Sequence, residues 1–199
     1  ELPAAVAERE FAVLRHLEEA GLPAVRAVGL AERPERGDAI LVTEYLRHSM
    51  QYRRLLMRLR DVSTAYRDGL LDAMALLLVD LHRGGVYWGD CSLANTLFRR
   101  DAGAFAAYLV DAETGEMHDR LSDGQRQYDL MTAETNVGGE LLDVEASGRL
   151  HPSIDPIATS EQVRERYETL WHEITAPESI GFGERHRLDA RIRRLNDLG

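Results

Sequence analysis

The feature that most constrains this chain is a short β-hairpin predicted between Asn95 and Asp111. The runs 96–99 and 106–110 have the composition of strands, and the residues 101–103 between them include a glycine and form a turn. In an antiparallel hairpin, the residue that enters the first strand lies beside the residue that leaves the second, on strands about 4.8 Å apart. The sequence therefore predicts that Asn95 and Asp111 are adjacent.

This arrangement indicates a site for a metal-bound phosphate. The amide oxygen of Asn95 and the carboxylate of Asp111 are ligands that suit Mg²⁺, which leaves its other positions to water or phosphate oxygens. Asp90 precedes Asn95 on the same loop and would face the group that reacts with the phosphate. In phosphoryl transfer one Asp accepts a hydroxyl proton while an Asn and a second Asp hold the metal.

The motif D-x-x-x-x-N from Asp90 to Asn95, followed by a hairpin and Asp111, resembles the catalytic loop of the protein-kinase-like superfamily. The WGD at 88–90 is closer to the HGD of aminoglycoside kinases, choline kinases and bacterial lipopolysaccharide kinases than to the HRD of most protein kinases. The resemblance implies a two-lobed α+β protein-kinase-like fold that uses ATP and Mg²⁺. There are two departures, because Trp88 replaces the usual His and an Ala-Glu pair at 112–113 replaces Phe-Gly.

The stretch AILVTEYL at 39–46 resembles the strand and hinge that join the two lobes of a kinase. The resemblance implies that Thr43 is the gatekeeper and that Glu44, Tyr45 and Leu46 offer backbone groups to adenine. A plain buried strand is the alternative interpretation of the same pattern.

A helix is predicted over 3–20, and it places Glu10 on the same face as Leu14 and Leu17. A carboxylate among apolar neighbours needs a cationic partner. The resemblance implies that this partner is the lysine of the third strand. Glu8 is an alternative for the role, and a solvated glutamate is a second alternative.

That lysine is missing, because all 24 basic residues of the chain are arginine. We therefore expect the sequence to be a fragment that begins just after the third strand, with the glycine-rich loop and the lysine before it. Residues 1–45 would be the N-terminally truncated remnant of the small lobe, and 46–199 the mostly helical large lobe. The apolar run 70–81 is predicted as the central helix that leads into the catalytic loop. A full protein without the lysine would be a pseudokinase.

Charge and composition exclude several other classes of function. A net charge of −10 argues against nonspecific DNA or RNA binding, which needs a basic surface. No signal peptide is expected, and no apolar run reaches the roughly 18 residues of a transmembrane span. A single cysteine cannot form an intramolecular disulfide, so a cytoplasmic location is expected. The scattered histidines do not have the spacing of a zinc site.

Four residues near these motifs have competing interpretations. Cys91 adjoins the catalytic Asp, but no His-containing signature accompanies it and a nucleophile is not expected. His82 is expected to cap the central helix rather than to act in catalysis. Asp129, in a YDL that resembles the YDLA of aminoglycoside-kinase-like proteins, would support the catalytic loop through backbone hydrogen bonds or else be an exposed helical Asp. Glu113 is a further candidate metal contact.

The C-terminal half is predicted to be helical. One helix, or two broken near Gly138-Gly139, spans 125–146, and further helices span 160–175 and 184–198. Over nearly its whole length the chain resembles the bacterial family domain of unknown function 4032, which is related to lipopolysaccharide kinases.

The predicted function is ATP- and Mg²⁺-dependent phosphotransfer to a hydroxyl of an unidentified acceptor. The alternative is a catalytically inactive nucleotide-binding pseudokinase or a regulatory interaction module. Trp88 and the lost glycine favour the alternative, whereas Asp90, Asn95 and Asp111 favour the enzyme.

Overall fold

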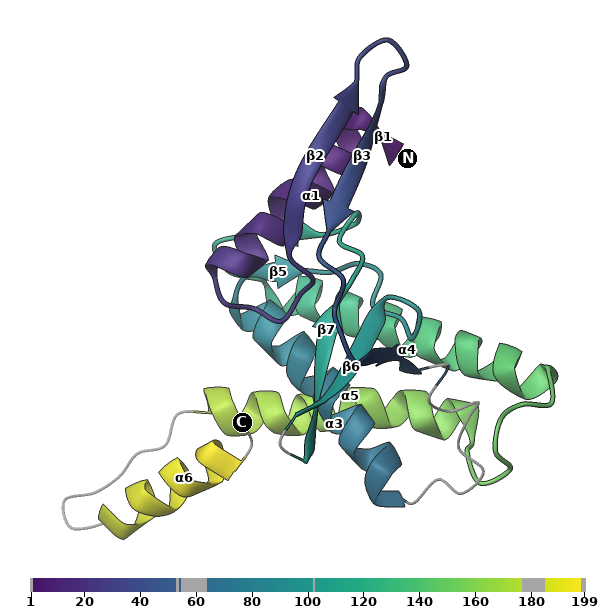
Figure 1. The fold of residues 1–199 in the computed structure, drawn as a ribbon. Helices are drawn as coiled ribbons and strands as arrows, with labels where there is room; N and C mark the ends of the chain where they lie inside the picture. Colours follow the sequence, from purple (N-terminus) through teal and green to yellow (C-terminus); the bar gives the residue numbers. More distant parts are fainter. Residues whose placement is uncertain (1, 53, 55–63, 102, 177–184, 198–199) are drawn as a thin grey trace.

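A small sheet with one helix lies at one end of the molecule, and longer helices lie on one side of a β-hairpin at the other end (Figure 1). This computed structural model describes residues 2–52, 54, 64–101, 103–176 and 185–197. The two ends are joined by the segment that follows the small sheet and by the segments on either side of the hairpin.

The small sheet has three antiparallel strands in the order β1-β3-β2. They are β1 (Leu2–Pro3), β2 (Ala27–Arg33) and β3 (Asp38–Thr43). Helix α1 (Ala4–Glu19) packs against β2 and β3. Its buried face repeats at helical spacing, as the sequence predicted, and consists of Ala7, Glu10, Val13, Leu14 and Leu17.

The predicted hairpin is confirmed. Strand β6 (Thr96–Asp101) pairs with β7 (Ala104–Leu109) in antiparallel register, from Thr96 opposite Leu109 to Asp101 opposite Ala104. The predicted turn over 101–103 began too early, because backbone pairing continues to Asp101, opposite Ala104. Strand β4 (Ser49–Gln51) extends the sheet on the other side of β6.

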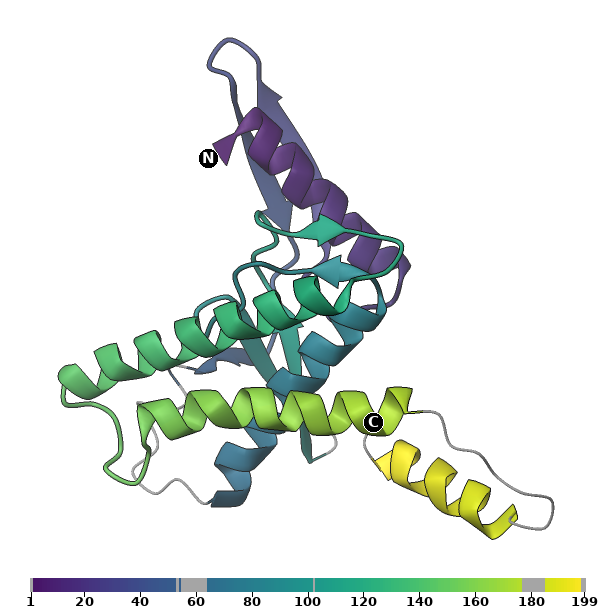
Figure 2. The ribbon, with the colours of Figure 1, turned by 180° about the vertical axis from the view of Figure 1, so that it is seen from behind.

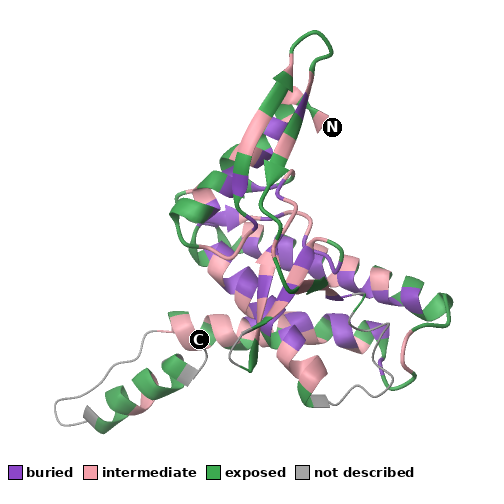
Figure 3. Ribbon diagram, viewed as in Figure 1, coloured by how far each residue is buried: buried purple, intermediate pink, exposed green. Residues whose placement is uncertain are grey.

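Three long helices form the rest of the core (Figures 1 and 2). The central helix α3 (Thr64–Arg83) packs against β7 and α5. It is longer than the predicted 70–81. Helices α4 (Asp123–Ala146) and α5 (Pro156–Thr175) lie side by side. The buried residues concentrate on α3, the hairpin and the inner faces of α4 and α5 (Figure 3).

Helix α4 is continuous, so of the two predicted alternatives the single helix is confirmed and the break near Gly138-Gly139 is wrong. Gly138 instead allows close packing against α5, since a Cβ there would lie 3.1 Å from Ser160 Oγ, whereas a Cβ at Gly139 would meet no atom within 4 Å. The start of α5 was also predicted too late. Asp155 caps this helix by accepting a hydrogen bond from the backbone of Ala158, and Ser160 is a buried residue inside the helix.

Two smaller elements complete the described fold. Strands β5 (Val86–Tyr87) and β8 (Glu116–Met117) pair and bring the start of the catalytic loop to the segment after the hairpin. Helix α6 (Arg185–Asp197) contacts the end of α5. The contact is made by Arg191, which donates hydrogen bonds to the carbonyl oxygens of Glu173 and Ala176. Among the described residues, no helix is long and apolar enough to cross a membrane.

Candidate active site

The candidate catalytic loop connects β5 to β6 and begins just after a tight turn at the end of α3. Gly85 forms that turn with a φ of 75°, a conformation that favours glycine. A Cβ at this position would also collide with the backbone carbonyl oxygen of His118. The backbone of His118 donates a hydrogen bond to the carbonyl of Gly85. The entry to the loop is therefore held against the segment around β8.

Two side-chain amides hold the carboxylate of Asp90. Asn95 Nδ2 lies 2.9 Å from Asp90 Oδ2, and Asn136 Nδ2 lies 3.0 Å from Asp90 Oδ1. The same two amides also donate to the carbonyl oxygens of Asp90 and Cys91. The carboxylate is only partly buried. It is therefore oriented from two sides and still accessible from solvent.

Asn95 and Asp111 lie at the open end of the hairpin. Val110 donates a backbone hydrogen bond to the carbonyl of Asn95 over 3.1 Å, and Asp111 is the next residue in the chain. Because Asn95 uses its amide nitrogen on Asp90, its side-chain oxygen is the atom left for a metal. Asp111 Oδ1 accepts a hydrogen bond from the backbone of Glu113 over 3.1 Å, which leaves Oδ2 as the atom for a metal.

These oxygen atoms fit the chemistry of Mg²⁺, which binds through one or two protein oxygens together with phosphate and water. Among the described residues, no group of three or more His, Cys, Asp or Glu side chains forms a metal site of its own. A shared position about 2.1 Å from both Asn95 and Asp111 stays a prediction, and so does a metal contact from Glu113.

Glu10 lies beside this segment and not in solvent. Its side chain is 7% exposed, and Oε1 accepts a long hydrogen bond of 3.5 Å from the backbone of Ala112. Burial raises the pKa of Glu10, the carboxylates of Asp111 and Glu113 raise it further, and the Ala112 hydrogen bond lowers it. Glu8 is exposed, so of the two candidates Glu10 is the one at the site.

Asp129 supports the catalytic loop from α4, as the sequence predicted, and the exposed alternative is wrong. Its buried carboxylate accepts backbone hydrogen bonds from Trp88 over 2.7 Å and from Gly89 over 2.9 Å. His82 Nε2 lies 3.1 Å from Asp129 Oδ2, and the other ring nitrogen lies 2.7 Å from the Tyr167 hydroxyl. His82 is thus a buried link between α4 and α5 as well as a residue of the last turn of α3.

The contacts of Asn136 and Trp88 were not predicted from the sequence. Asn136 lies two helical turns after Asp129 on α4, and this spacing, which puts both residues on the same face of the helix, could have indicated its contact with the loop. Trp88 is fully buried and donates its indole N–H to the carbonyl of Asp111 over 2.8 Å. Its own carbonyl accepts a hydrogen bond from the hydroxyl of Thr114 over 2.7 Å.

Cys91 is buried beneath the loop. Burial raises the pKa of its thiol well above the ordinary value, and the nearby carboxylates of Asp129, Asp90 and Glu140 raise it further. The thiolate is disfavoured, which confirms that Cys91 is not suited to be a nucleophile.

The predicted hinge follows the last residue of β3, which is Thr43. The backbone of Glu44 donates to the carbonyl of Arg26 over 2.8 Å, and its carboxylate accepts from Arg26 Nε over 2.7 Å. Tyr45 is 80% exposed, and Leu46 packs partly against the core. Thr43 is exposed as well, so a plain buried strand does not describe this end of β3. Adenine binding by these residues stays a prediction.

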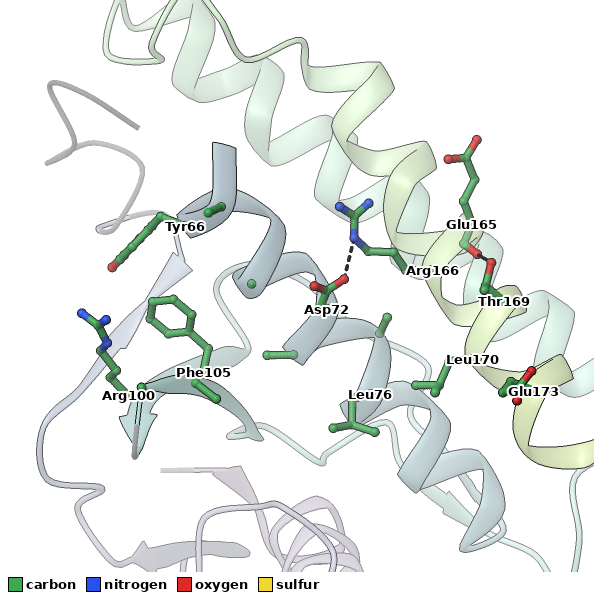
Figure 4. Close-up of a pocket in the computed structure, with 16 residues that line it drawn as sticks. Tyr66, Asp72, Leu76, Arg100, Phe105, Glu165, Arg166, Thr169, Leu170 and Glu173 are labelled. Atoms are coloured by element: carbon green, nitrogen blue, oxygen red, sulfur yellow. Dashed lines mark hydrogen bonds and ion pairs between the residues drawn. The ribbon is translucent and has the colours of Figure 1, made fainter. Parts of the chain in front are cut away.

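A cavity of about 1040 Å³ lies away from this site, between α3, α5 and the tip of the hairpin (Figure 4). Its wall includes Tyr66, Leu76, Phe105 and Leu170, with Arg166 joined to Asp72 at the rim. Asp90, Asn95 and Asp111 do not line it.

Comparisons with known proteins identify a similar fold and a similar sequence. The solved structure of WaaP in complex with acyl carrier protein matches 96% of this chain and 76% of its own with a TM-score of 0.61, at 22% identity, which shows a common fold. The lipopolysaccharide core heptose(I) kinase WaaP of Pseudomonas aeruginosa is 29% identical over 138 residues. That alignment covers 65% of this chain and 52% of the relative, so the chain spans about half the length of this curated relative.

Two family profiles match different parts of the chain. The domain of unknown function 4032 matches residues 169–199 only, so the expected resemblance over nearly the whole chain was too broad. The lipopolysaccharide kinase (Kdo/WaaP) profile matches residues 1–137, which include Glu10, Asp90, Asn95 and Asp111. The chain therefore belongs to the lipopolysaccharide kinase (Kdo/WaaP) family.

Proposed function

We propose that this protein is an ATP- and Mg²⁺-dependent phosphotransferase that acts on a hydroxyl group. The observation that carries the proposal is the orientation of the Asp90 carboxylate by Asn95 and Asn136, on a loop whose backbone is held by Asp129. A general base must be positioned before it can accept a proton efficiently. Membership of a kinase family supports the same reaction.

Each residue of the site has a distinct part in the proposed mechanism. Asp90 orients the acceptor hydroxyl and takes its proton while the hydroxyl oxygen bonds to the γ-phosphorus of ATP, whose bond to the bridging oxygen breaks so that ADP leaves. The side-chain oxygens of Asn95 and Asp111 would hold Mg²⁺, which would neutralise charge on the transferred phosphate. Glu10 needs a cation to offset its burial, and a lysine is not supplied by these 199 residues, whose basic residues are all arginine.

We further propose that residues 1–45 form the small, nucleotide-covering lobe and 46–199 the catalytic lobe. Thr43 to Leu46 would then lie beside adenine, on the chain that links the two lobes. A sugar hydroxyl is the first acceptor to test, because one relative is named as a heptose kinase. A cytoplasmic location agrees with the use of ATP.

A catalytically inactive nucleotide-binding protein is the second candidate. Trp88 in place of the usual His and Glu113 in place of glycine favour it. Both candidates predict nucleotide binding, so only turnover separates them.

The test is Asp90→Ala in the full-length protein. We expect MgATP affinity close to that of wild type and a fall in phosphotransfer or ATP turnover of roughly 10²- to 10⁴-fold, the usual contribution of a positioned general base. Asp119→Ala, at an exposed position, is the matched control. A wild type that binds MgATP but turns over no faster than Asp90→Ala, across sugars, lipopolysaccharide-like acceptors and proteins, would establish the inactive alternative.

A further inference from the structure

Trp88 occupies a place where related kinases usually have His, and its contacts show what the larger ring does. We propose that Trp88 is a positioning residue that holds the backbone of Asp111 and thereby sets the metal-binding carboxylate. This inference rests on the function proposed above and adds a residue to it. The substitution that first suggested an inactive protein then becomes part of the catalytic architecture.

Three hydrogen bonds connect Trp88 to helix α4 and to the segment that follows the hairpin. Its indole N–H donates to the carbonyl of Asp111, its backbone N–H donates to the Asp129 carboxylate on α4, and its carbonyl accepts from the Thr114 hydroxyl. The distances are 2.8, 2.7 and 2.7 Å. Because Trp88 is fully buried, its own polar atoms are shielded from water. The ring therefore joins the catalytic loop to the segment that carries Asp111.

Asp111 needs such a contact because it lies beyond the end of the sheet. Strand β7 ends at Leu109, and the last backbone bond across the hairpin is the one from Val110 to Asn95. The Trp88 bond is the next restraint on the main chain. On the side-chain side, Asp111 Oδ1 is held by the backbone of Glu113.

Repulsion at the site makes this restraint more important. The carboxylates of Asp111 and Glu113 face the buried Glu10 closely enough to raise its pKa. Like charges favour any movement that separates them. A neutral donor on the Asp111 carbonyl opposes that movement and adds no charge of its own.

The donor, and not only the size of the ring, should decide the effect of a substitution. Tryptophan and histidine both have a ring N–H, whereas phenylalanine has none. Phenylalanine, in contrast, is larger than histidine. If the hydrogen bond matters, Trp88→His should be the milder substitution. If only the filled space matters, Trp88→Phe should be the milder one.

The experiment compares full-length wild type, Trp88→Phe, Trp88→His and Trp171→Phe. Trp171 is the other tryptophan of the chain, and among the described residues its indole N–H has no hydrogen-bond acceptor. Two quantities are measured: the Mg²⁺ concentration that gives half of the ATP-dependent rise in melting temperature, and hydrogen exchange of the backbone amides of Ala112, Glu113 and Gly115. The exchange measurement needs no nucleotide.

We expect Trp88→Phe to raise the Mg²⁺ midpoint roughly tenfold, which is equivalent to about 1.4 kcal/mol, and to speed exchange at the three amides. Trp88→His should return the midpoint to within roughly threefold of wild type, and Trp171→Phe should leave both quantities unchanged. The proposal is overturned if His is worse than Phe, if Trp171→Phe has the same effects, or if exchange rises while the midpoint stays constant. A wild type with no Mg²⁺-dependent stabilisation would instead refute the proposed function, and unchanged exchange in Trp88→Phe would refute the contact itself.

Discussion

Asn136 donates a hydrogen bond from its side-chain amide to Asp90 Oδ1 over 3.0 Å, so α4 directly holds the proposed catalytic carboxylate. The same helix holds the loop backbone through Asp129. The inner face of α4 thus orients both the main chain and the reactive side chain of the loop. This relationship gives a rigid support to a residue that is itself accessible to solvent.

Asn136→Ala should reduce phosphotransfer by roughly 10- to 100-fold, because one of the two amides that orient Asp90 is lost. MgATP affinity should stay close to that of wild type, since Asn136 does not contact the proposed metal ligands. Steady-state kinetics with a saturating nucleotide would measure the effect. Thr135→Ala is the control, because Thr135 is an exposed neighbour whose hydroxyl bonds only to the helix carbonyl of Met131. Equal rates for the two variants would contradict a role for Asn136.

Asp111→Asn should abolish the Mg²⁺-dependent part of stabilisation by ATP in the full-length protein. Ligand binding to the folded state raises its melting temperature by mass action, and a neutral amide is a weaker ligand for Mg²⁺ than a carboxylate. The measurement is a thermal-shift titration with and without Mg²⁺. Asp119→Asn changes a carboxylate in the following segment and should behave as wild type. The metal role of Asp111 would be abandoned if wild type and Asp111→Asn gained equal stability from MgATP.

Glu10→Gln should stabilise the 199-residue chain at neutral pH. The folded state raises the pKa of Glu10 above its ordinary 4.5, so the folded protein binds more protons than the unfolded chain between that pH and the raised value. Stability is therefore lost as the pH rises through this window. Glutamine keeps the oxygen that faces Ala112 and carries no charge.

The check is the melting temperature from about pH 4 to about pH 8. The advantage of Glu10→Gln over wild type should grow as the pH rises and then become constant above the raised pKa. Glu8→Gln, at an exposed position on the same helix, should show no such trend. Parallel curves for wild type and Glu10→Gln would show that the buried carboxylate imposes no pH-dependent cost.

Asp129→Ala should destabilise the protein by about 3 to 5 kcal/mol. The substitution removes the acceptor of three donors, two of them backbone N–H groups of the catalytic loop, in a fully buried location. Tyr167→Phe removes a single hydroxyl at the other end of the His82 link and should cost only about 1 kcal/mol. Urea unfolding would measure both values. Asp123 is exposed in the first turn of α4, and Asp123→Ala should change the free energy of unfolding by less than about 1 kcal/mol. A change as small as this for Asp129→Ala would disprove the buried network.

Two adjacent glycines of α4 should respond to alanine with opposite signs. Gly139→Ala should stabilise the protein by about 1 kcal/mol, because the new Cβ enters open space and alanine is the better helix former. Gly138→Ala should destabilise it, since its Cβ would lie 3.1 Å from Ser160 Oγ and would push α5 away. Thermal unfolding of the pair measures the difference under identical conditions. Stabilisation by both substitutions would show that α4 and α5 separate easily.

The local elements of this protein follow from its sequence. The hairpin between Asn95 and Asp111 and the central helix before the loop were predicted, because strand composition, turn residues and helical periodicity act over short distances. The proposed catalytic motif was recognised for the same reason, since Asp90 and Asn95 share one loop. Element ends were less accurate, as the longer strands of the hairpin and the earlier start of α5 show.

Tertiary structure alone decided which side chains support that loop. Asn136 and Asp129 come from a helix far along the chain, and only the packing of α4 beneath the loop brings their polar atoms to Asp90 and to the backbone. The indole N–H of Trp88 donates to the carbonyl of Asp111 only because the hairpin brings the chain back to the loop. Gly138 is a further example, since glycine within a helix predicts a break from local propensity, whereas here the close approach of α5 requires it. Such contacts join residues distant in sequence, and their free energy depends on burial and geometry that no local pattern encodes.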